Sequence, residues 1–381
     1  MRSKYNKTAA IIGAGASGCI CAYYLLKSGM EVTLFDYASP LRTLLPTGGG
    51  RCNLAHAEYD FKELAKNYPR GEKFLYSVFS KFSTYDTLAL FEELGVETYT
   101  QDNGRIFPIS NSAKDVREKV LDKIKKAEFI KEGVNEITPI ENGFRIKTDK
   151  AEYFFTDVVI SVGGVGKHRF IKGIEHHIVD CTPALVGLNA DIKTLSGVVL
   201  KDVYSNDCKL KDDLLFTHFG ISGPLAYKIS SIKTKDAFPY KLTFDLYNKD
   251  LDLQKMLNDN PHKVFKNILS AIFPHRFAEY ILGEYAEVKA HKIDGKTRDL
   301  ILDKIHNFEV CVSGTNKGEE TVTAGGYDLD EINPKTMESK IYPNLYIIGE
   351  ALNIDGFCGG FNLQNAWSTA FVASEGIINK N

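Results

Sequence analysis

The 381-residue sequence predicts an α/β protein with a parallel sheet. Two separate parts of the chain form this α/β domain, and a region of different structure is inserted between them. Two observations support this prediction. The first is a strand–turn–helix–strand opening over residues 8–36, the pattern of a parallel βαβ unit. The second is a change of pattern along the chain. Residues 187–246 read as short strands and turns, residues 251–306 read as helices, and a buried strand returns at Asn344–Gly349.

The first predicted strand leads into a dinucleotide-binding turn. Thr8–Ile12 is a short apolar run, and Gly13-x-Gly15-x-x-Gly18 follows it and opens a helix. In such a turn the first glycine permits the tight bend, the second lets the backbone approach a pyrophosphate, and the third lets helix and strand pack closely. Asp36 ends the next strand, where its carboxylate would accept hydrogen bonds from an adenosine ribose.

The following elements extend this Rossmann-like domain. A helical pattern covers residues 74–95, and the charge-rich segment 123–131 reads as the solvated face of a helix. A hairpin over residues 143–156 then leads into the buried strand Asp157–Val162, which ends in two glycines. A hairpin feeding such a strand is how FAD-binding domains of the glutathione-reductase type are built, and we expect the same fold here by analogy.

Two later segments favour FAD over NAD as the bound dinucleotide. FAD is long, and its ribityl and isoalloxazine parts lie far from the adenosine, so distant parts of the chain must hold them. Thr47–Asn53 contains three glycines and an arginine, a backbone that can press against a ligand and donate N–H groups. Gly349 and Glu350 end a buried strand ahead of Asp355–Asn362, where a carboxylate can bind ribityl hydroxyls and a helix N-terminus can stabilise charge on the flavin.

The sequence resembles a family of bacterial FAD-dependent oxidoreductases that are labelled aminoacetone-oxidase type or NAD(FAD)-utilising dehydrogenases. The resemblance covers nearly the whole chain, and its segments are Thr47–Asn53, Phe216–Pro224, Val322–Gly326, Thr336–Lys340 and Gly349–Trp367. It implies an FAD-binding domain in two parts, interrupted by a β-barrel-like domain and a helical domain. The chain departs from the family at Leu41–Pro46, where a glycine and basic residues are usual, and at Cys358, where a small hydroxyl residue is usual.

Pattern and resemblance together divide the chain into five segments. The FAD-binding domain takes residues 1–186 and 327–381, the inserted β domain takes 187–248 and 307–326, and the helical insert takes 249–306. Ligand sites favour domain interfaces, so we expect the substrate pocket where the inserted domains meet the flavin.

The predicted cofactor contacts come from the fingerprint, the glycine-rich loop, the ends of later strands and the C-terminal motif. They are Gly13, Gly15, Ala16, Ser17, Gly18, Asp36, Thr47, Gly48, Gly49, Gly50, Arg51, Cys52, Asn53, Val134, Gly163, Gly164, Gly349, Glu350, Asp355, Gly359, Gly360, Asn362 and Leu363. Arg51 would offset phosphate or flavin charge, or it would fix its own loop. Asp355 would touch the ligand or cap the turn that follows it. No metal site is predicted.

Two residues are candidates for catalysis. His218 would act as a general acid or a substrate contact, and the alternative is a hydrogen-bonded structural histidine on a strand. Cys358 lies in the cofactor-facing C-terminal motif and could form a redox pair with Cys52. Two small residues packed on the cofactor are favoured over such a pair, because buried thiols are usually inert.

The composition indicates the cellular compartment and the classes of binding partner. Hydrophobic residues make up 44% and charged residues 25%, and the formal net charge is −2, so no global positive field attracts nucleic acid and none is expected as a partner. No apolar run is long enough to span a bilayer, and the glycines in Thr8–Leu26 argue against a signal peptide. Seven cysteines without a C-x-x-C pair favour a reducing cytoplasm.

The predicted function is an FAD-dependent oxidoreductase that acts on an unidentified small molecule. NAD(P)H is a candidate transient reductant, although Ser161–Gly166 reads as a strand end rather than a second fingerprint. One alternative is a flavin-dependent RNA-modifying enzyme, whose distinguishing feature would be a basic stripe on the insert. Another is a non-catalytic flavin-binding redox sensor. A plain NAD-linked dehydrogenase would leave the C-terminal motif unexplained.

Overall fold

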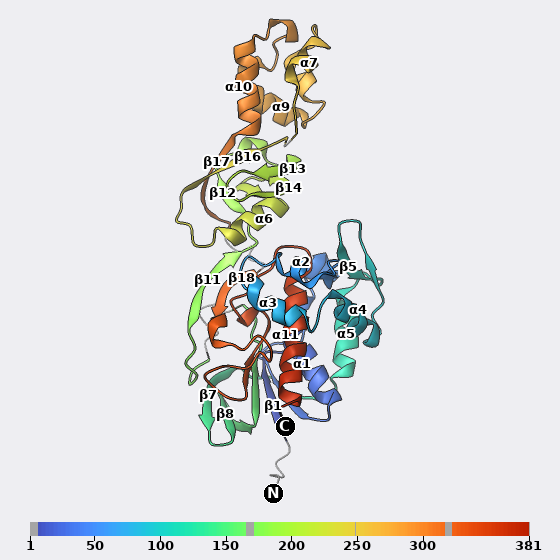
Figure 1. Ribbon diagram of the computed structural model, residues 1–381, viewed down its shortest axis with the longest axis vertical. Coiled ribbons are helices and arrows are strands. Elements are labelled where there is room, and N and C mark those ends of the chain that lie inside the picture. Colours follow the sequence, from blue (N-terminus) through green and yellow to red (C-terminus); the bar gives the residue numbers. More distant parts are fainter. Residues whose placement is uncertain (1–6, 165–170, 248, 317–321, 381) are drawn as a thin grey trace. The chain divides into compact units, whose positions relative to one another are not determined.

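The computed structural model divides the chain into two compact units (Figure 1). The described residues are 7–164, 171–247, 249–316 and 322–380. One unit takes Met1–Thr182 and Val322–Asn381, and the other takes Pro183–Thr321. Val165 and Gly166, from the second glycine-containing segment of the sequence, lie outside the described residues.

The first unit is built on a five-stranded sheet in the order β19-β10-β1-β2-β6. Its strands are β1 (Thr8–Ile12), β2 (Glu31–Phe35), β6 (Glu128–Ile130), β10 (Asp157–Ile160) and β19 (Leu345–Ile347). All four neighbouring pairs are parallel, and β1 lies at the centre between β10 and β2. The predicted parallel α/β fold is confirmed, and the apolar run of β1 is buried because both faces of the sheet are covered.

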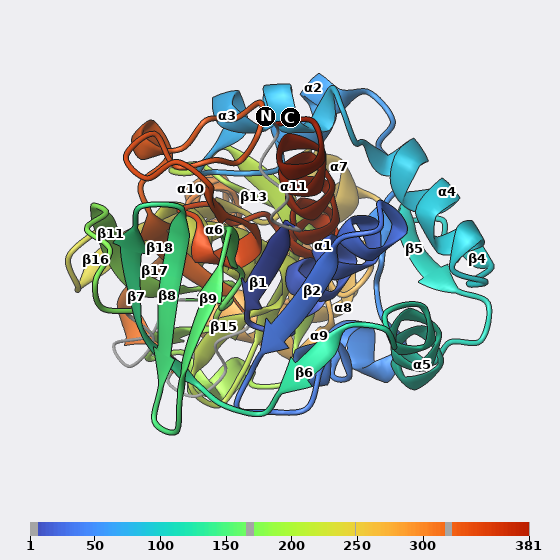
Figure 2. The same cartoon turned by 90° about the horizontal axis from the view of Figure 1, so that it is seen from below.

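Helices cover one face of this sheet and an antiparallel meander covers the other. The elements are α1 (Ala16–Lys27), α5 (Ala113–Lys123) and α11 (Phe361–Ile378), with the meander β7 (Val134–Ile140), β8 (Gly143–Thr148) and β9 (Glu152–Phe155). Figure 2 shows the meander to one side of β1 and α1 to the other. On the meander side, Phe35 of β2 makes edge-on ring contacts with Tyr153 and Phe155 of β9.

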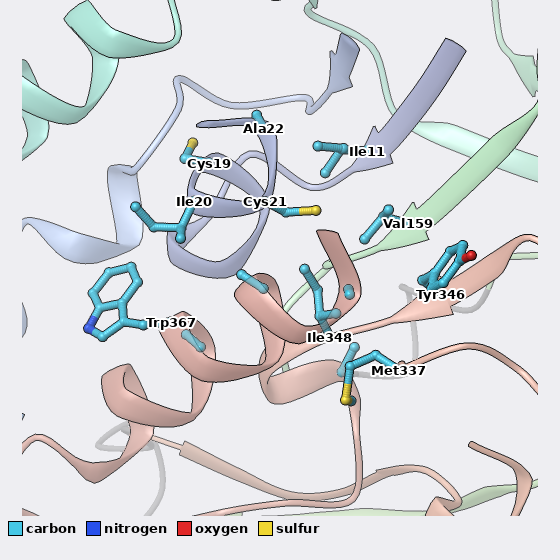
Figure 3. Packing of buried hydrophobic residues seen from close by; sticks show 14 of the residues in the cluster. Ile11, Cys19, Ile20, Cys21, Ala22, Val159, Met337, Tyr346, Ile348 and Trp367 are labelled. Carbon is cyan, nitrogen blue, oxygen red and sulfur yellow. The ribbon is translucent and has the colours of Figure 1, made fainter. Parts of the chain in front are cut away.

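The core of this unit lies where α1 meets the sheet and α11. Figure 3 shows Cys19, Ile20 and Cys21 of α1 among side chains of the sheet and of α11. Cys21 and the neighbouring Ile11 and Val159 are completely buried. One continuous apolar cluster therefore holds the sheet against α1 and α11.

Smaller elements surround the sheet of the first unit. They are β3 (Ala55–His56), β4 (Thr98–Thr100) and β5 (Arg105–Pro108), which form an antiparallel sheet, β11 (Ile178–Ala184) and β18 (Val322–Tyr327), which form a pair, and the helices α2 (Phe61–Ala65), α3 (Glu72–Phe79) and α4 (Thr84–Glu93). The prediction of one helical stretch over residues 74–95 is wrong, because α3 and α4 are separate helices. Ser83 and Asp86 form a capping box that starts α4, so the chain breaks between α3 and α4.

The segment 123–131 is also not a helix face. α5 ends at Lys123, and Glu128–Ile130 forms the edge strand β6, which pairs with β2. Thr33 on β2 donates a hydrogen bond to the Glu128 carboxylate at 3.2 Å. Charged residues are common on edge strands because they discourage pairing with other chains, and charge patterning alone does not separate that case from a helix.

The second unit is a closed six-stranded barrel with the helices of residues 253–306 at one end (Figure 1). Its strands follow the order β12-β15-β14-β13-β16-β17, and the elements are β12 (Leu188–Ala190), β13 (Val199–Ser205), β14 (Leu210–Phe216), β15 (Gly220–Ser222), α6 (Gly223–Ile232), β16 (Tyr240–Asp245), α7 (Leu253–Asn258), α8 (Phe265–Leu269), α9 (His275–Leu282), α10 (Gly295–His306) and β17 (Phe308–Thr315). The rings of Phe216, Phe277 and Phe308 meet at 5.9–6.2 Å, so barrel and helices share one core. The predicted barrel-like insert is confirmed.

Among the helices that the structure describes, none is long and apolar enough to cross a membrane.

Candidate cofactor site

The fingerprint turn between β1 and α1 uses its three glycines in different ways. Gly13 has φ +106, and a Cβ there would overlap the carbonyl of Ser161. A Cβ on Gly18 would overlap the Gly13 carbonyl and lie 2.6 Å from the Ser161 hydroxyl, so packing of helix on strand requires both glycines. Gly15 differs, because its φ is −81 and the nearest atom to a Cβ would be Thr43 Oγ1 at 4.0 Å. Only a ligand lying on the backbone gives a reason for glycine at this position, and the FAD pyrophosphate fits that requirement.

The start of α1 and the end of β2 complete this half of the site. Among the described residues no side chain caps α1, so the N–H groups of Ala16 and Ser17 point out of the helix end towards any bound anion. Asp36 accepts hydrogen bonds from the N–H groups of Ala14 and Ala38, both at 2.8 Å. The structure thus holds the carboxylate against the fingerprint turn, where the adenosine ribose was predicted to lie.

The segment Thr47–Asn53 forms a tight left-handed loop. Gly48, Gly49 and Gly50 have φ values of +58, +68 and +84, and Cys52 has φ +64. The Cys52 N–H donates to the Thr47 carbonyl at 3.0 Å and closes the loop. Successive residues in such conformations turn their N–H groups to a common side, and this arrangement binds anionic or carbonyl oxygens.

Arg51 is engaged with its own loop. Its Nε donates to the Gly48 carbonyl at 3.2 Å, and its guanidinium lies over the Phe107 ring at 4.2 Å from the centroid. The second of the two predicted roles, fixing the loop, therefore has direct structural support. Cation and ring together hold the loop in the conformation that presents its N–H groups.

Cys52 is completely buried within this loop. Burial raises the pKa of its thiol to about 12, so the thiol stays protonated at neutral pH. It is a free thiol, and no disulfide joins it to Cys358, which is half-buried. These observations favour packing over redox exchange for Cys52.

The two glycine-rich segments, about three hundred residues apart, form one cradle. With its amide oriented to satisfy its neighbours, Asn53 accepts a hydrogen bond from the Gly360 N–H at 3.1 Å and donates to two carbonyls of the small β3–β5 sheet. His56 Nδ1 donates to the Gly359 carbonyl at 3.1 Å. A Cβ on Gly360, which has φ +100, would overlap the Ala55 carbonyl, so this contact requires glycine.

Asp355 and Asn362 hold the C-terminal loop in shape. The Asp355 carboxylate is fully buried and forms a two-pronged ion pair with Arg70. The Asn362 amide bonds both the N–H and the carbonyl of Gly356, at 2.8 and 2.7 Å. Sequence reasoning missed Arg70. The available signal was that a buried carboxylate needs a cationic partner, and the sequence does not say which of many cations supplies it.

The end of β19 lies beside the start of α1. A Cβ on Gly349, which has φ +67, would lie 2.5 Å from Ser17 Oγ. Glu350 accepts a hydrogen bond from the Thr323 N–H at 2.9 Å, and a Cβ on Gly164 would lie 2.9 Å from the same carboxylate oxygen. The fold thus gathers Ser17, Gly164, Gly349 and Glu350, all predicted cofactor contacts, from three separate parts of the chain.

Asn365 is a residue of this region that sequence reasoning did not single out. It lies on α11 one turn before Thr369, whose hydroxyl accepts a hydrogen bond from the Gly349 N–H at 3.0 Å. Asn365 is 2% exposed, and its Oδ1 has no hydrogen-bond partner among the described residues. An orphaned buried oxygen on the helix face beside the β19 end is what a bound cofactor would satisfy. The helix carries several amide and hydroxyl side chains, so no sequence signal singled out Asn365.

The other predicted residues are placed as follows. Val134 is the first residue of β7 and pairs with Thr148 of β8, and Leu363 packs against the core from the first turn of α11. Leu41, from the segment that departs from the family pattern, has φ +55, a conformation in which the family's glycine would be unstrained.

His218 lies in the second unit, at the tip of the β14–β15 hairpin. The turn is closed by the Thr217 N–H, which donates to the Gly220 carbonyl at 2.7 Å. The His218 side chain is exposed, stands edge-on to the Phe219 ring, and makes no hydrogen bond with any described residue. The alternative of a hydrogen-bonded histidine on a strand is therefore wrong, and the imidazole is available to solvent or to a ligand.

Comparison with known proteins identifies the family of this chain. A family model described as the HI0933-like protein Rossmann domain matches residues 7–376. The chain belongs to this family. The resemblance to NAD(FAD)-utilising dehydrogenases is thereby confirmed, and the chain is an enzyme of this FAD-dependent oxidoreductase family.

Three curated relatives match over almost the full length. Ribosomal RNA dihydrouridine synthase from Escherichia coli (strain K12) is 29% identical over 97% of this chain and 98% of its own. Its namesake from Haemophilus influenzae is 28% identical over 98% of each chain. The 3-dehydro-bile acid delta(4,6)-reductase of Clostridium scindens is 25% identical over 95% of this chain and 97% of its own.

Solved structures share the fold at much lower identity. A 3-ketosteroid delta1-dehydrogenase from Sterolibacterium denitrificans superimposes with a TM-score of 0.51 at 12% identity, over 99% of this chain and 100% of its own. Mycobacterium smegmatis Sdh1 gives 0.52 at 13%, over 98% of this chain and 68% of its own. At such identities the similarity shows the fold alone.

Proposed function

We propose that this enzyme reduces a carbon–carbon double bond conjugated to a carbonyl, and that its substrate is a uridine of ribosomal RNA. The names of the curated relatives support the reaction class. Dihydrouridine is uridine with two hydrogens added across C5–C6, a bond conjugated to the C4 carbonyl. A delta(4,6)-reductase of a 3-dehydro bile acid acts on double bonds conjugated to the 3-oxo group. The substrates differ in size and charge, but the bond is of one kind.

The observation that carries the choice of RNA is the full-length similarity to two ribosomal RNA dihydrouridine synthases at 28–29% identity. The formal net charge of −2 led to the expectation of no nucleic-acid partner. Net charge averages over the whole surface, whereas binding of a phosphate backbone needs only a local group of cations. The proposal therefore replaces that expectation.

Reduction of the double bond takes up one hydride and one proton. FAD, when bound and reduced, supplies the hydride. NAD(P)H is the proposed reductant of the flavin. Gly15 and Asp36 would hold the adenosine diphosphate part of FAD, and Asn53 keeps the two glycine-rich loops together. The proton for the carbon next to the carbonyl would come from His218 or Cys358. His218 is exposed and makes no hydrogen bond with any described residue, so its imidazole is available to a substrate.

The test is to incubate the purified FAD-loaded protein with NADPH or NADH and with ribosomal RNA from a strain that lacks the gene for this protein. Dihydrouridine is then measured by mass spectrometry of nucleosides, and its position by analysis of RNA fragments. Formation at one defined position supports the proposal. A flavin that NAD(P)H reduces, with no dihydrouridine formed in RNA or in intact ribosomal subunits, contradicts it.

A small-molecule reductase is the second candidate, and the bile-acid reductase relative favours it. The same assay includes a steroid with a 3-oxo-4,6-diene, with oxidation of NAD(P)H as the measurement. Turnover of the steroid together with inert RNA selects this candidate. If no donor reduces the flavin and neither reaction occurs, the redox-sensor alternative is favoured.

A further inference from the structure

The helical part of the second unit carries a group of exposed cations on two adjoining segments. Asn260–Lys266 and Lys289–Lys296 lie side by side, joined by a β-bridge between Val264 and Lys289 and by further backbone hydrogen bonds. We call the exposed basic residues of these segments the insert patch. Its members are His262, Lys263, Lys289, His291, Lys292 and Lys296.

The lysines of the insert patch are not neutralised by ion pairs. None of the four lies within ion-pair distance of a carboxylate among the residues that the structure describes, whereas five lysines of the barrel strands and of α6 with its C-cap are so paired. Two nearby acids are already engaged. Asp294 caps α10 by accepting the Thr297 N–H at 2.7 Å, and Glu287 pairs with Lys266. The Asp294 carboxylate keeps its charge while it caps the helix. With Asp259, two carboxylates of or next to these segments that form no ion pair among the described residues face the four lysines, so the patch keeps an excess of positive charge.

The two histidines add planar rings to this charge. The rings of His262 and His291 meet edge to face at 5.8 Å, and both residues are exposed. His291 Nδ1 donates to the Pro261 carbonyl at 2.7 Å, which fixes the ring against the neighbouring segment. Cations beside exposed planar rings suit a single-stranded nucleic acid, because lysines bind its phosphates and rings stack on its bases.

We propose that the insert patch binds the phosphate backbone of the RNA substrate. This inference rests on the proposed function, and it assigns to the helical part of the second unit the role of holding RNA. A basic surface on the inserted region is the feature that separates an RNA-modifying enzyme from a reductase of small molecules. Such a surface gives affinity and positioning without reading sequence.

The experiment replaces Lys263, Lys289, Lys292 and Lys296 by Gln in the full-length, FAD-loaded protein. The matched control replaces four exposed lysines of the first unit that also have no ion pair among the described residues. These are Lys123, Lys126, Lys131 and Lys147. The charge change is identical in the two variants. Flavin absorption and the thermal unfolding temperature verify that both fold and bind FAD, and binding of a labelled ribosomal RNA fragment is measured by fluorescence anisotropy over a range of salt concentrations.

Loss of four phosphate contacts should lower the slope of log K against log salt by about 3 and the affinity at physiological salt on the order of 100-fold. The control should stay near wild type in both quantities. If the wild type binds RNA and the patch variant matches it in slope and affinity, the inference is overturned while dihydrouridine formation can still stand. If the wild type neither binds nor modifies RNA, the proposed function itself fails. Patch-dependent binding to anionic vesicles or heparin, without RNA binding, would also overturn the inference.

Discussion

Replacement of Gly15 by Ala should weaken FAD binding strongly while leaving the fold intact. A Cβ at this position would have no protein atom closer than Thr43 Oγ1 at 4.0 Å, and the backbone φ of −81 suits any residue. The cost to the apoprotein is the loss of a helix N-cap glycine, about 1 kcal/mol at most. The new methyl group instead occupies the space in which the pyrophosphate approaches the backbone.

Gly18→Ala provides the matched comparison in the same turn. Its Cβ would overlap the Gly13 carbonyl and lie 2.6 Å from the Ser161 hydroxyl, so helix and strand must separate. Overpacking of this kind costs about 1–3 kcal/mol or more, and it falls on the apoprotein. Gly15→Ala should therefore lower the affinity for FAD and leave stability unchanged. Gly18→Ala should lower stability whether or not FAD is bound.

The assay is urea unfolding of both apoproteins together with FAD titration by flavin fluorescence. For Gly15→Ala we expect a free energy of unfolding within about 1 kcal/mol of wild type and FAD affinity weaker by about 100-fold, equivalent to about 2.7 kcal/mol. Wild-type FAD affinity in this variant would refute the assignment of the pyrophosphate to Gly15. A large loss of apoprotein stability would refute the inference that the space beside Gly15 is open.

Three further predictions concern the ion pair, a thiol and the exposed imidazole. Arg70→Met leaves the buried Asp355 carboxylate without its cation, so the free energy of unfolding should fall by about 3–5 kcal/mol, and Arg70→Met with Asp355→Leu should recover much of this loss in urea unfolding. Because burial raises the pKa of Cys52 from 9.0 to about 12, its thiol stays protonated in the fold while the unfolded chain ionises above pH 9. Its contribution to stability is complete below pH 9 and falls by about 1.4 kcal/mol per pH unit above it, a slope that Cys52→Ala should reduce. Iodoacetamide at pH 8 should label the exposed Cys311 and spare Cys52 in the native protein, and equal labelling would contradict the burial. His218→Gln should leave FAD content and thermal stability unchanged and lower kcat about 100-fold or more if the imidazole supplies the proton, and an unchanged kcat would transfer that role elsewhere.

Local patterns were sufficient to predict the dinucleotide-binding half of the molecule. The fingerprint, the strand before it and the acid after it lie within residues 8–36, so their spacing alone specifies a tight turn between parallel strands. The barrel-like insert was also expected, partly from short alternating strands and partly from the family resemblance. In both cases the signal lies in residues close together in the chain.

Errors arose where a local pattern fits two structures. Charged residues in 123–131 suit a solvated helix and an edge strand equally, and only pairing of β6 with β2 decides between them. The stretch 74–95 has a continuous helical period, but α3 ends at Phe79 and the capping box at Ser83 begins α4. The edge strand depends on which neighbour it pairs with, and its own residues do not encode that neighbour. The capping box, in contrast, is a local signal that the continuous helical period concealed.

The sequence by itself predicted the fold class and FAD as the cofactor, and it indicated both glycine-rich loops of the cradle, because glycine spacing reports directly on backbone conformation. The tertiary structure alone decided the partners of those residues. Arg70 reaches Asp355, Asn53 reaches Gly360, and Asn365 presents an unsatisfied oxygen beside the β19 end. Contacts between residues hundreds of positions apart are set by how the whole core packs, and no local period records them.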